Sequence, residues 1–382
     1  MTDSGTEQLT VLMSPIYSDS NPYQSELIRA LEAHNVRVHP VDDVGAFPLL
    51  SGVRRHGVPD VLHLHWVHRF FIAERRGRPL FAVLLSVRLF FELVVLKLLG
   101  VRLVWTVHNL VNHEGHAQRS ELATRHVVAR LADRIVVHCE SAVGTVRDRY
   151  RLPDHVGDRI RVVPHGNFAD AYRDEITKTE ARRRLELPED DPIFLYFGLI
   201  RPYKNVPELA ETFQTVDGDA RLLIVGKPWN EAIEDRVRRA CTGDNRIETV
   251  LEYVPDEEVQ VYLRAADAVV LPFDSILTSG SAVLGMTFGR AVIAPRLGCL
   301  PELVGSSGGI LYEPSDPDGL RSGLHRVMKN PEGLAAMERR NRAAARQLDW
   351  DHIGERTRTV YLQGSKLDVG DTKHASKEMT VP

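Results

Sequence analysis

Short apolar runs alternate with longer amphipathic stretches along most of the chain. In the first half, the predicted strands cover 9–13, 60–65, 101–107, 133–138 and 159–164, with helical stretches such as 23–35 and 121–132 between them. The second half repeats the alternation, with strands predicted at 192–197, 220–225, 245–254, 267–272 and 290–295. Short apolar strands separated by helices form parallel sheets that helices cover on both faces. The pattern therefore predicts an α/β chain of two doubly wound, Rossmann-like domains.

The polar segment 167–180 lacks apolar periodicity and marks the boundary between the two domains. We expect an N-terminal domain at 1–172, a C-terminal domain at 173–345 and a closing helix at 346–363. Residues 364–382 carry no core pattern, which is typical of a disordered tail. Ligands of such sheets bind at the carboxyl ends of the strands, so the two domains should face an interdomain cleft lined by residues that follow strands.

Composition narrows the class of protein. The chain has 382 residues and a net charge of −4, so no global attraction to nucleic acid is expected. Three scattered cysteines, Cys139, Cys241 and Cys299, form no close pair, and we expect no structural disulfide and a reducing compartment. The N-terminus lacks the basic start and apolar core of a signal peptide. A cytoplasmic protein fits these features.

The most apolar stretch, FAVLLSVRLFFELVVLKLL at 81–99, is nearly long enough to cross a bilayer. Arg88, Glu92 and Lys97 lie inside it, and charges at the centre of a bilayer are costly, so we do not expect a true span. Two interpretations stay open. The stretch is either a helix buried in the domain or a helix that touches a membrane surface beside the basic run at 75–78.

The stretch FGLIRPYKN at 197–205 follows a predicted buried strand and has the residues to grip a diphosphate. Gly198 provides the turn, and Arg201 and Lys204 place two cations at the start of the next element. Charge-assisted contacts to phosphate are among the stronger hydrogen bonds in proteins. The alternative is that these residues form an ordinary solvated turn.

A second stretch, LTSGS at 277–281, occupies the corresponding place after another predicted strand. Ser279, Gly280 and Ser281 offer small side chains and unpaired backbone N–H groups where a helix begins, a setting that favours anions. A simple helix cap is the alternative. Two anion-holding stretches in one domain together favour a nucleotide or nucleotide-sugar site.

Polar and aromatic residues also follow the predicted strands of the first half. The long loop at 14–25 contains Asn21 and Tyr23. In HLHW at 63–66, His63 and His65 should share one face of the strand while Trp66 points the other way. His63, His65 and His68 could hold zinc, but contact with a sugar at the rim of the cleft is the favoured interpretation for His65 and Trp66.

The richest cluster of hydrogen-bonding residues is TVHNLVNHEGH at 106–116. His108, Asn109, His113 and Glu114 are candidates for the acceptor side of the cleft, with a purely structural loop as the alternative. The turn VVPHGNF at 162–168 places Gly166 where backbone can come close to a ligand.

Several of these stretches together resemble the GT-B glycosyltransferases, especially glycosyltransferase family 4 and its subset that builds surface polysaccharides or glycolipids. The stretches that carry the resemblance, in order, are HLHW, WTVHNLVNHE, VVPHGN, FGLIRPYKN, DEEVQVYLRAADAVVLPF and GMTFGRAVIAPRLGCLPELV. Their order and spacing extend over roughly residues 8–363. The fold implied is GT-B, two Rossmann-like domains facing a cleft.

The resemblance implies transfer of a sugar from a nucleotide-diphosphate sugar to a hydroxyl of a lipid-linked or polysaccharide glycan. We expect the sugar to be a hexose and its configuration to be retained. Arg201 and Lys204 would neutralise the diphosphate leaving group, and His108 would contact the transferred sugar. No cofactor and no metal is expected, because no DxD-like carboxylate pair follows a strand of the second half. Peripheral contact with the inner face of the cell membrane is a further expectation.

One feature departs from the family pattern. Family 4 enzymes usually carry two glutamates eight positions apart, and Ile276 and Leu284 stand at those places. Asp274 is the only acid nearby and the remaining candidate for a donor contact. A sugar-nucleotide epimerase of the same fold and a metal-dependent hydrolase built on the histidine clusters stay open as alternatives.

Overall fold

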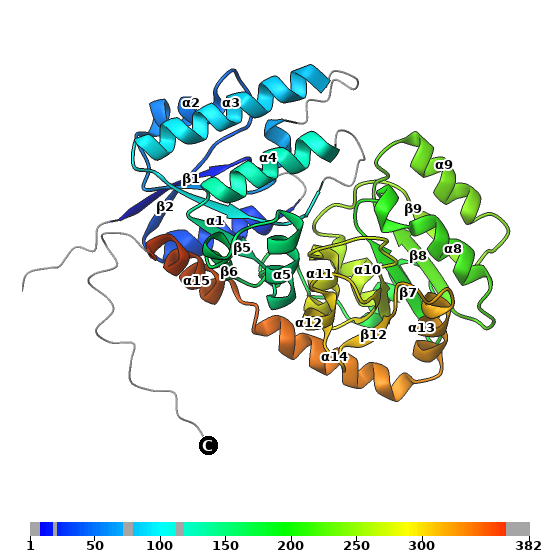
Figure 1. Cartoon of the computed structure of the whole chain (residues 1–382). Coiled ribbons are helices and arrows are strands. Elements are labelled where there is room, and N and C mark those ends of the chain that lie inside the picture. The colour runs from blue at the N-terminus through cyan, green and yellow to red at the C-terminus, as the bar shows by residue number, and fades with distance from the viewer. Residues whose placement is uncertain (1–7, 18–20, 72–78, 112–117, 364–382) are drawn as a thin grey trace, which may run out of the picture.

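Two wholly parallel sheets, each with six strands in the part of the chain that the structure describes, form the frame of the molecule (Figure 1). The sequence predicts the two parallel sheets, with five of the six strands in each. The computed structural model describes residues 8–17, 21–71, 79–111 and 118–363. The first sheet has the order β2-β1-β3-β4-β5-β6, from β1 (Leu9–Ser14), β2 (Val36–Pro40), β3 (Val61–Leu64), β4 (Arg102–Thr106), β5 (Arg134–Val137) and β6 (Ile160–Val162). The second has the order β12-β11-β10-β7-β8-β9, from β7 (Ile193–Phe197), β8 (Arg221–Val225), β9 (Ile247–Val250), β10 (Ala268–Val270), β11 (Ala291–Pro295) and β12 (Gly309–Tyr312).

Helices cover both faces of each sheet. The first domain contains α1 (Tyr23–Ala33), α2 (Pro48–His56), η1 (Val67–Phe70), α3 (Pro79–Leu98), α4 (Gln118–Leu131), α5 (Glu140–Arg149) and α6 (Asp154–Gly157). The rest of the chain contains α7 (Lys178–Arg184), η2 (Pro202–Lys204), α8 (Val206–Gln214), α9 (Glu231–Ala240), α10 (Val259–Ala265), α11 (Gly280–Thr287), α12 (Leu300–Val304), α13 (Gly319–Met328), α14 (Pro331–Arg346) and α15 (Trp350–Leu362). Sandwiched between helices, the central strands are almost fully buried, which explains their continuous apolar runs.

The last helix returns to the first domain. After α14 passes along the second domain, α15 packs against α1, and Trp350, Ile353 and Tyr361 join the core formed by β1 and α1 (Figure 1). A Cβ atom at Gly166 would lie 2.4 Å from the Trp350 ring. Gly166 therefore makes room for α15. That its backbone also comes close to a ligand stays a prediction.

Only one face of α3 is buried. Leu89, Leu93 and Leu96 pack into the core, whereas a run of apolar side chains, including Leu84, Val87 and Phe91, is exposed to solvent. The interpretation of α3 as a fully buried helix is therefore wrong. Arg88 and Glu92 are neighbours on the buried side, as predicted. Among the described helices, none is long and apolar enough to cross a membrane; the basic run at 75–78 lies outside the described residues.

A disulfide corrects the expectation drawn from the cysteines. Cys139, at the start of α5, is bonded to Cys299, at the start of α12, and Cys241 is left as a thiol. The sequence did not reveal the pair because its members are separated by 160 positions and lie in different domains. Parallel strands bring residues distant in sequence to the same edge, so spacing alone cannot detect such a pair.

Candidate functional site

Three of the residues predicted to bind the donor converge at the carboxyl edge of the second sheet. Gly198, directly after β7, has a φ of +127°, and a Cβ atom built on it would lie 3.1 Å from Ser281 Oγ and 3.6 Å from Lys204 Nζ. A side chain at this position would be strained and would intrude between the cation and the hydroxyl. Glycine therefore keeps open a small polar space, which we call the cradle, between η2 and the N-terminus of α11.

Lys204 is the cation at the centre of the cradle. Desolvation by the surrounding protein, together with the neighbouring charge of Arg201, lowers the pKa of its amine to about 7. Its Nζ lies 6.0 Å from the centre of the Tyr196 ring and 5.9 Å from that of Phe273. These distances are at the outer limit of a weak cation–π contact. An anion that binds next to Lys204 stabilises the charged form of the amine and is itself bound more tightly for that reason.

The N-terminus of α11 forms the opposite wall. The Ser279 side chain accepts a hydrogen bond from Ala282 N at 3.1 Å and so caps the helix. Ser279 therefore acts as a helix cap, which is the structural alternative to contact with an anion. Gly280 and Ser281 begin the helix beside the cradle. Asp274 lies at the rim: its backbone N–H donates to Tyr203 O, and the residue is exposed.

A chain of imidazoles lies across the cleft in the first domain. His138 Nδ1 lies 2.8 Å from Val163 O, His138 Nε2 lies 3.3 Å from His108 Nδ1, and His108 Nε2 lies 3.0 Å from His65 Nδ1. Burial lowers the pKa of all three rings, to about 4 for His138 and well below the usual value for His65 and His108. The three imidazoles are therefore neutral at neutral pH.

The carbonyl of Val163 fixes the tautomer of every ring in this chain. A carbonyl only accepts, so His138 donates from Nδ1 and accepts at Nε2. His108 then donates from Nδ1 and accepts from His65 at Nε2. The series leaves His65 Nε2 as a bare acceptor, and this atom is buried with no partner among the described residues.

His165 connects this cluster to the second domain. Its Nδ1 donates to Gly166 O at 2.7 Å, so its Nε2 is a second bare acceptor, and that atom lies 3.7 Å from the position of a Cβ on Gly280. Burial also lowers the pKa of His165, to about 3. The imidazoles thus lead from His108 through His138 and His165 to the helix that walls the cradle.

The neighbouring aromatic residues differ from expectation in one respect. The strand β3 ends at Leu64, so Trp66 does not follow the alternation of the strand, and its ring stacks on His108 at 4.4 Å between centroids. Trp66 thus joins the histidines, and the prediction that it points the other way is wrong. Both ring nitrogens of His63 are hydrogen-bonded within the protein, Nδ1 to the Tyr361 hydroxyl and Nε2 to Thr106 Oγ1, each at 2.7 Å. His63 therefore has a structural role.

The other acceptor-side candidates are less concentrated. Tyr23 is buried with its ring against His108 and His165, and burial raises its pKa. The side chain of Asn21 accepts from Tyr23 N at 3.0 Å. The carbonyl of Asn109 accepts from Arg125. The predictions for His113 and Glu114 lie outside the described residues.

Three contributors to the site are not among the residues that the sequence predicts for it. His138 lies at the end of a predicted strand, so the rule that ligand-binding residues follow strands is enough to identify it. Trp229 follows β8 in the same way and lies under Arg201. Glu302 accepts hydrogen bonds from Glu140 N and Ser141 N at the start of α5, at 2.8 and 2.6 Å, beside the Cys139–Cys299 disulfide. No local pattern indicates that Glu302 bonds across domains.

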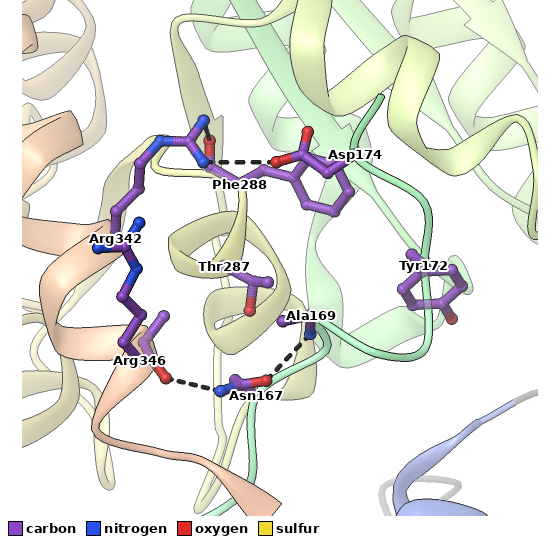
Figure 2. A pocket seen from close by; sticks show the side chains of 9 residues that line it. Asn167, Ala169, Tyr172, Asp174, Thr287, Phe288, Arg342 and Arg346 are labelled. Carbon is purple, nitrogen blue, oxygen red and sulfur yellow. Dashed lines mark hydrogen bonds and ion pairs between the residues drawn. The ribbon is translucent and has the colours of Figure 1, made fainter. Parts of the chain in front are cut away.

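A pocket lies elsewhere, at the linker between the domains (Figure 2). The linker is held there by hydrogen bonds from the side chain of Asn167 to Ala345 O and from Ala169 N to Asn167, and by the ion pair of Arg342 with Asp174. None of the predicted donor or acceptor residues lines it. We therefore place the candidate site at the cradle and the histidine cluster.

The sequence is similar to those of known glycosyltransferases. Residues 177–346, which include the cradle, match the family model described as Glycosyl transferases group 1. A GDP-mannose:glycolipid 4-beta-D-mannosyltransferase of Xanthomonas campestris pv. campestris is 29% identical over 369 residues, which cover 94% of each chain. A D-inositol 3-phosphate glycosyltransferase of Acidothermus cellulolyticus is 28% identical over 356 residues, covering 87% of this chain and 74% of the relative.

Solved structures show the same fold. Sucrose-phosphate synthase from Thermosynechococcus elongatus superposes with a TM-score of 0.70 at 19% identity, over 93% of this chain and 98% of that one. Anabaena HepE in complex with UDP-glucose gives a TM-score of 0.68 at 14% identity, over 92% and 98%. With the matched family model and the relatives that align along nearly the whole chain, the conclusion is that the protein is a glycosyltransferase with the GT-B fold.

Proposed function

We propose that the protein transfers a hexose from a nucleoside-diphosphate sugar to a hydroxyl of a lipid-linked or polysaccharide glycan. The observation that carries the proposal is the cradle, where Gly198, Lys204 and Ser281 converge, with His165 of the histidine cluster next to the start of α11. A diphosphate suits the cradle, and a sugar, whose hydroxyls donate hydrogen bonds, suits the imidazoles. GDP-mannose is the first donor to test, because a relative that aligns along the whole chain is named for it.

The chemistry follows from charge. As the bond between the anomeric carbon and the diphosphate breaks, negative charge grows on the leaving oxygen. Lys204 and Arg201 stand where that charge develops, and preorganised charge of this kind is usually the largest catalytic contribution. His108 belongs to the neutral cluster that would face the sugar and exclude water from the electron-deficient carbon.

Independence from metal ions is part of the proposal. Two cations already serve the leaving group, which is the task that a divalent ion performs in other transferases. Transfer should therefore persist in EDTA. Loss of transfer in EDTA, restored by Mn²⁺ or Zn²⁺, would count against independence from metal and make the histidine clusters candidates for metal ligands.

Retention of the anomeric configuration enters the proposal through the family resemblance alone. Ile276 and Leu284 are apolar, so neither can contact the sugar or ribose as the usual glutamates would. The anomeric configuration of the product, read by NMR, decides the matter: an α-linked product from an α-linked donor supports retention, and a β-linked product overturns it.

We also propose that the acceptor is presented at the cytoplasmic face of a membrane. The exposed apolar face of α3, with Leu84, Val87 and Phe91, lies on the outer side of the acceptor domain (Figure 1). Arg54 and Arg55 are exposed at the end of α2, which packs on α3. Apolar side chains beside basic ones match an anionic bilayer surface.

The test is a panel of GDP, UDP, ADP and dTDP sugars, measured first by thermal shift and then by transfer to a polyprenyl-diphosphate-linked glycan. Stabilisation by one nucleotide series with release of the diphosphate and growth of the glycan supports the proposal. A changed sugar still attached to the nucleotide would favour the epimerase alternative. No stabilisation by any nucleotide sugar would overturn the proposal.

A further inference from the structure

Trp229 has an exposed ring beside the cradle. It lies in the loop between β8 and α9 and is 46% exposed, more than any other tryptophan among the described residues. The guanidinium carbon of Arg201 sits 4.4 Å from the centre of its ring. A large exposed aromatic ring is unfavourable in water, and contact with a cation is a means of stabilising it there.

Backbone hydrogen bonds hold the two residues together. Trp229 N donates to Ile200 O, and Ile200 N donates to Lys227 O, both at 2.9 Å. Ile200 is fully buried, so the loop after β7 is anchored between the core and the loop after β8. The position of the indole relative to Arg201 is thus set by the main chain of both loops.

The geometry of this contact suits phosphate binding. Guanidinium is planar, and its N–H donors point outward in the plane. Contact with an indole uses the face of the group and none of its in-plane donors, which are the atoms that bind phosphate oxygens. The contact also restricts the rotation of the long Arg201 side chain before the ligand binds. Less conformational entropy is then lost on binding.

We propose that Trp229 is a positioning residue, which holds Arg201 in the orientation that receives the diphosphate of the donor. The inference rests on the proposed function and adds a residue to it. Trp229 acts through Arg201, so its effect requires the guanidinium and disappears without it.

A double-mutant cycle tests this relationship. GDP and UDP are titrated by calorimetry into the wild type, Trp229→Leu, Trp229→Phe, Arg201→Ala and the double variant Trp229→Leu/Arg201→Ala. Loss of an exposed cation–π contact should weaken binding about fivefold in Trp229→Leu. Trp229→Phe should retain most of the affinity, since it keeps an aromatic face. In the Arg201→Ala background, Trp229→Leu should have no further effect.

Fluorescence provides an independent measurement. Trp105 and Trp350 are buried, and Trp66 is stacked on His108 in the first domain, so a nucleotide that draws on Arg201 should change the emission of Trp229 most. Trp229→Phe should abolish that change while the calorimetric binding persists. Tyr253→Leu, which removes another exposed ring of the same domain, serves as the control and should leave both measurements unchanged.

Two failures can be told apart. If the wild type binds neither nucleotides nor nucleotide sugars, the proposed function fails and this inference falls with it. If the wild type binds but Trp229→Leu binds equally well, or weakens binding by the same factor with and without Arg201, the positioning role is wrong and the proposed function stands.

Discussion

Cys139 and Cys299 are bonded to each other across the two domains, with their Cα atoms 5.6 Å apart. The neighbouring Glu302 accepts two backbone hydrogen bonds from the start of α5, and Leu277 and Cys299 are buried in the core of the first domain. One edge of the cleft is therefore joined by a covalent bond, a carboxylate cap and apolar packing at once. Any opening of the cleft has to pivot about this edge.

Removing the disulfide should lower stability. For a closed loop of this length, the chain-entropy model gives a contribution of about 5 kcal/mol. Thermal unfolding of Cys299→Ser, and of the wild type in dithiothreitol, should shift to lower temperature, whereas Cys241→Ser should unfold as the wild type does. Identical melting with and without reductant, or free thiols at both positions by mass spectrometry, would show that the bond does not form.

Loss of either of the two cations, Lys204 or Arg201, should reduce transfer. Charge-assisted contacts to phosphate contribute about 1.5–3 kcal/mol each, so Lys204→Ala and Arg201→Ala should each lower kcat/KM by roughly ten- to a hundredfold. Lys329→Ala, an exposed lysine at the end of α13, is the matched control. Circular dichroism checks the fold of each variant. Wild-type rates in both cradle variants would remove these residues from the site.

Donor binding should weaken as the pH rises above neutrality. The pKa of Lys204 is lowered to about 7 in the unliganded protein, so below pH 7 the amine is already charged and above it a proton must be taken up on binding. The affinity for a nucleotide sugar should then fall by up to about tenfold per pH unit. In Lys204→Arg, whose guanidinium stays protonated, the profile from pH 7 to 9 should be flat. An equal slope in both proteins contradicts the role of the amine.

Acid should destabilise the fold through the buried histidines. Burial lowers the pKa of His63, His138 and His165 to about 3 to 4, whereas in the unfolded chain these rings titrate near 6.5. Below pH 6.5 the unfolded state binds protons that the folded state excludes, so the free energy of unfolding falls as the pH falls. Each such proton contributes up to about 1.4 kcal/mol per pH unit.

Urea unfolding at intervals from pH 7.5 to 4.5 measures this slope. His138→Asn should lower the slope by the share of one proton, and the exposed His352→Gln should leave it unchanged. Stability that is constant down to pH 4.5 would mean that the histidines are accessible to protons in the folded protein.

Charge on the exposed face of α3 should abolish membrane binding. The wild type should sediment with anionic vesicles at low salt and be released as salt screens the attraction. Val87→Glu and Phe91→Glu, at positions that are 59% and 51% exposed, should remain in the supernatant. Tyr253→Glu, on the second domain, should behave as the wild type. A wild type that never sediments rules out docking on such a surface.

The sequence predicts the central strands and the cradle because both depend on local patterns. Buried parallel strands are continuous apolar runs, and Gly198, Lys204 and Ser281 each follow one. The pattern does not predict β2 and β12, because part of each strand is exposed and its apolar run is short.

Relationships between distant residues could not be predicted. The disulfide, the cap formed by Glu302 and the stacking of Trp66 on His108 each depend on how separate elements pack. The order of the imidazoles from Val163 to His65 likewise requires the spacing of adjacent strands. Such contacts leave no periodic trace in the residues that make them.

The return of α15 to the first domain has a consequence for biosynthesis. Trp350, Ile353 and Tyr361 belong to the same core as residues of β1 and α1. The Tyr361 hydroxyl is also hydrogen-bonded to His63. During translation, the first domain emerges with that face uncovered and waits for the entire second domain to be made. Its core is complete only when the last helix leaves the ribosome, so a nascent chain or a truncation that ends before residue 350 would expose apolar surface to chaperones.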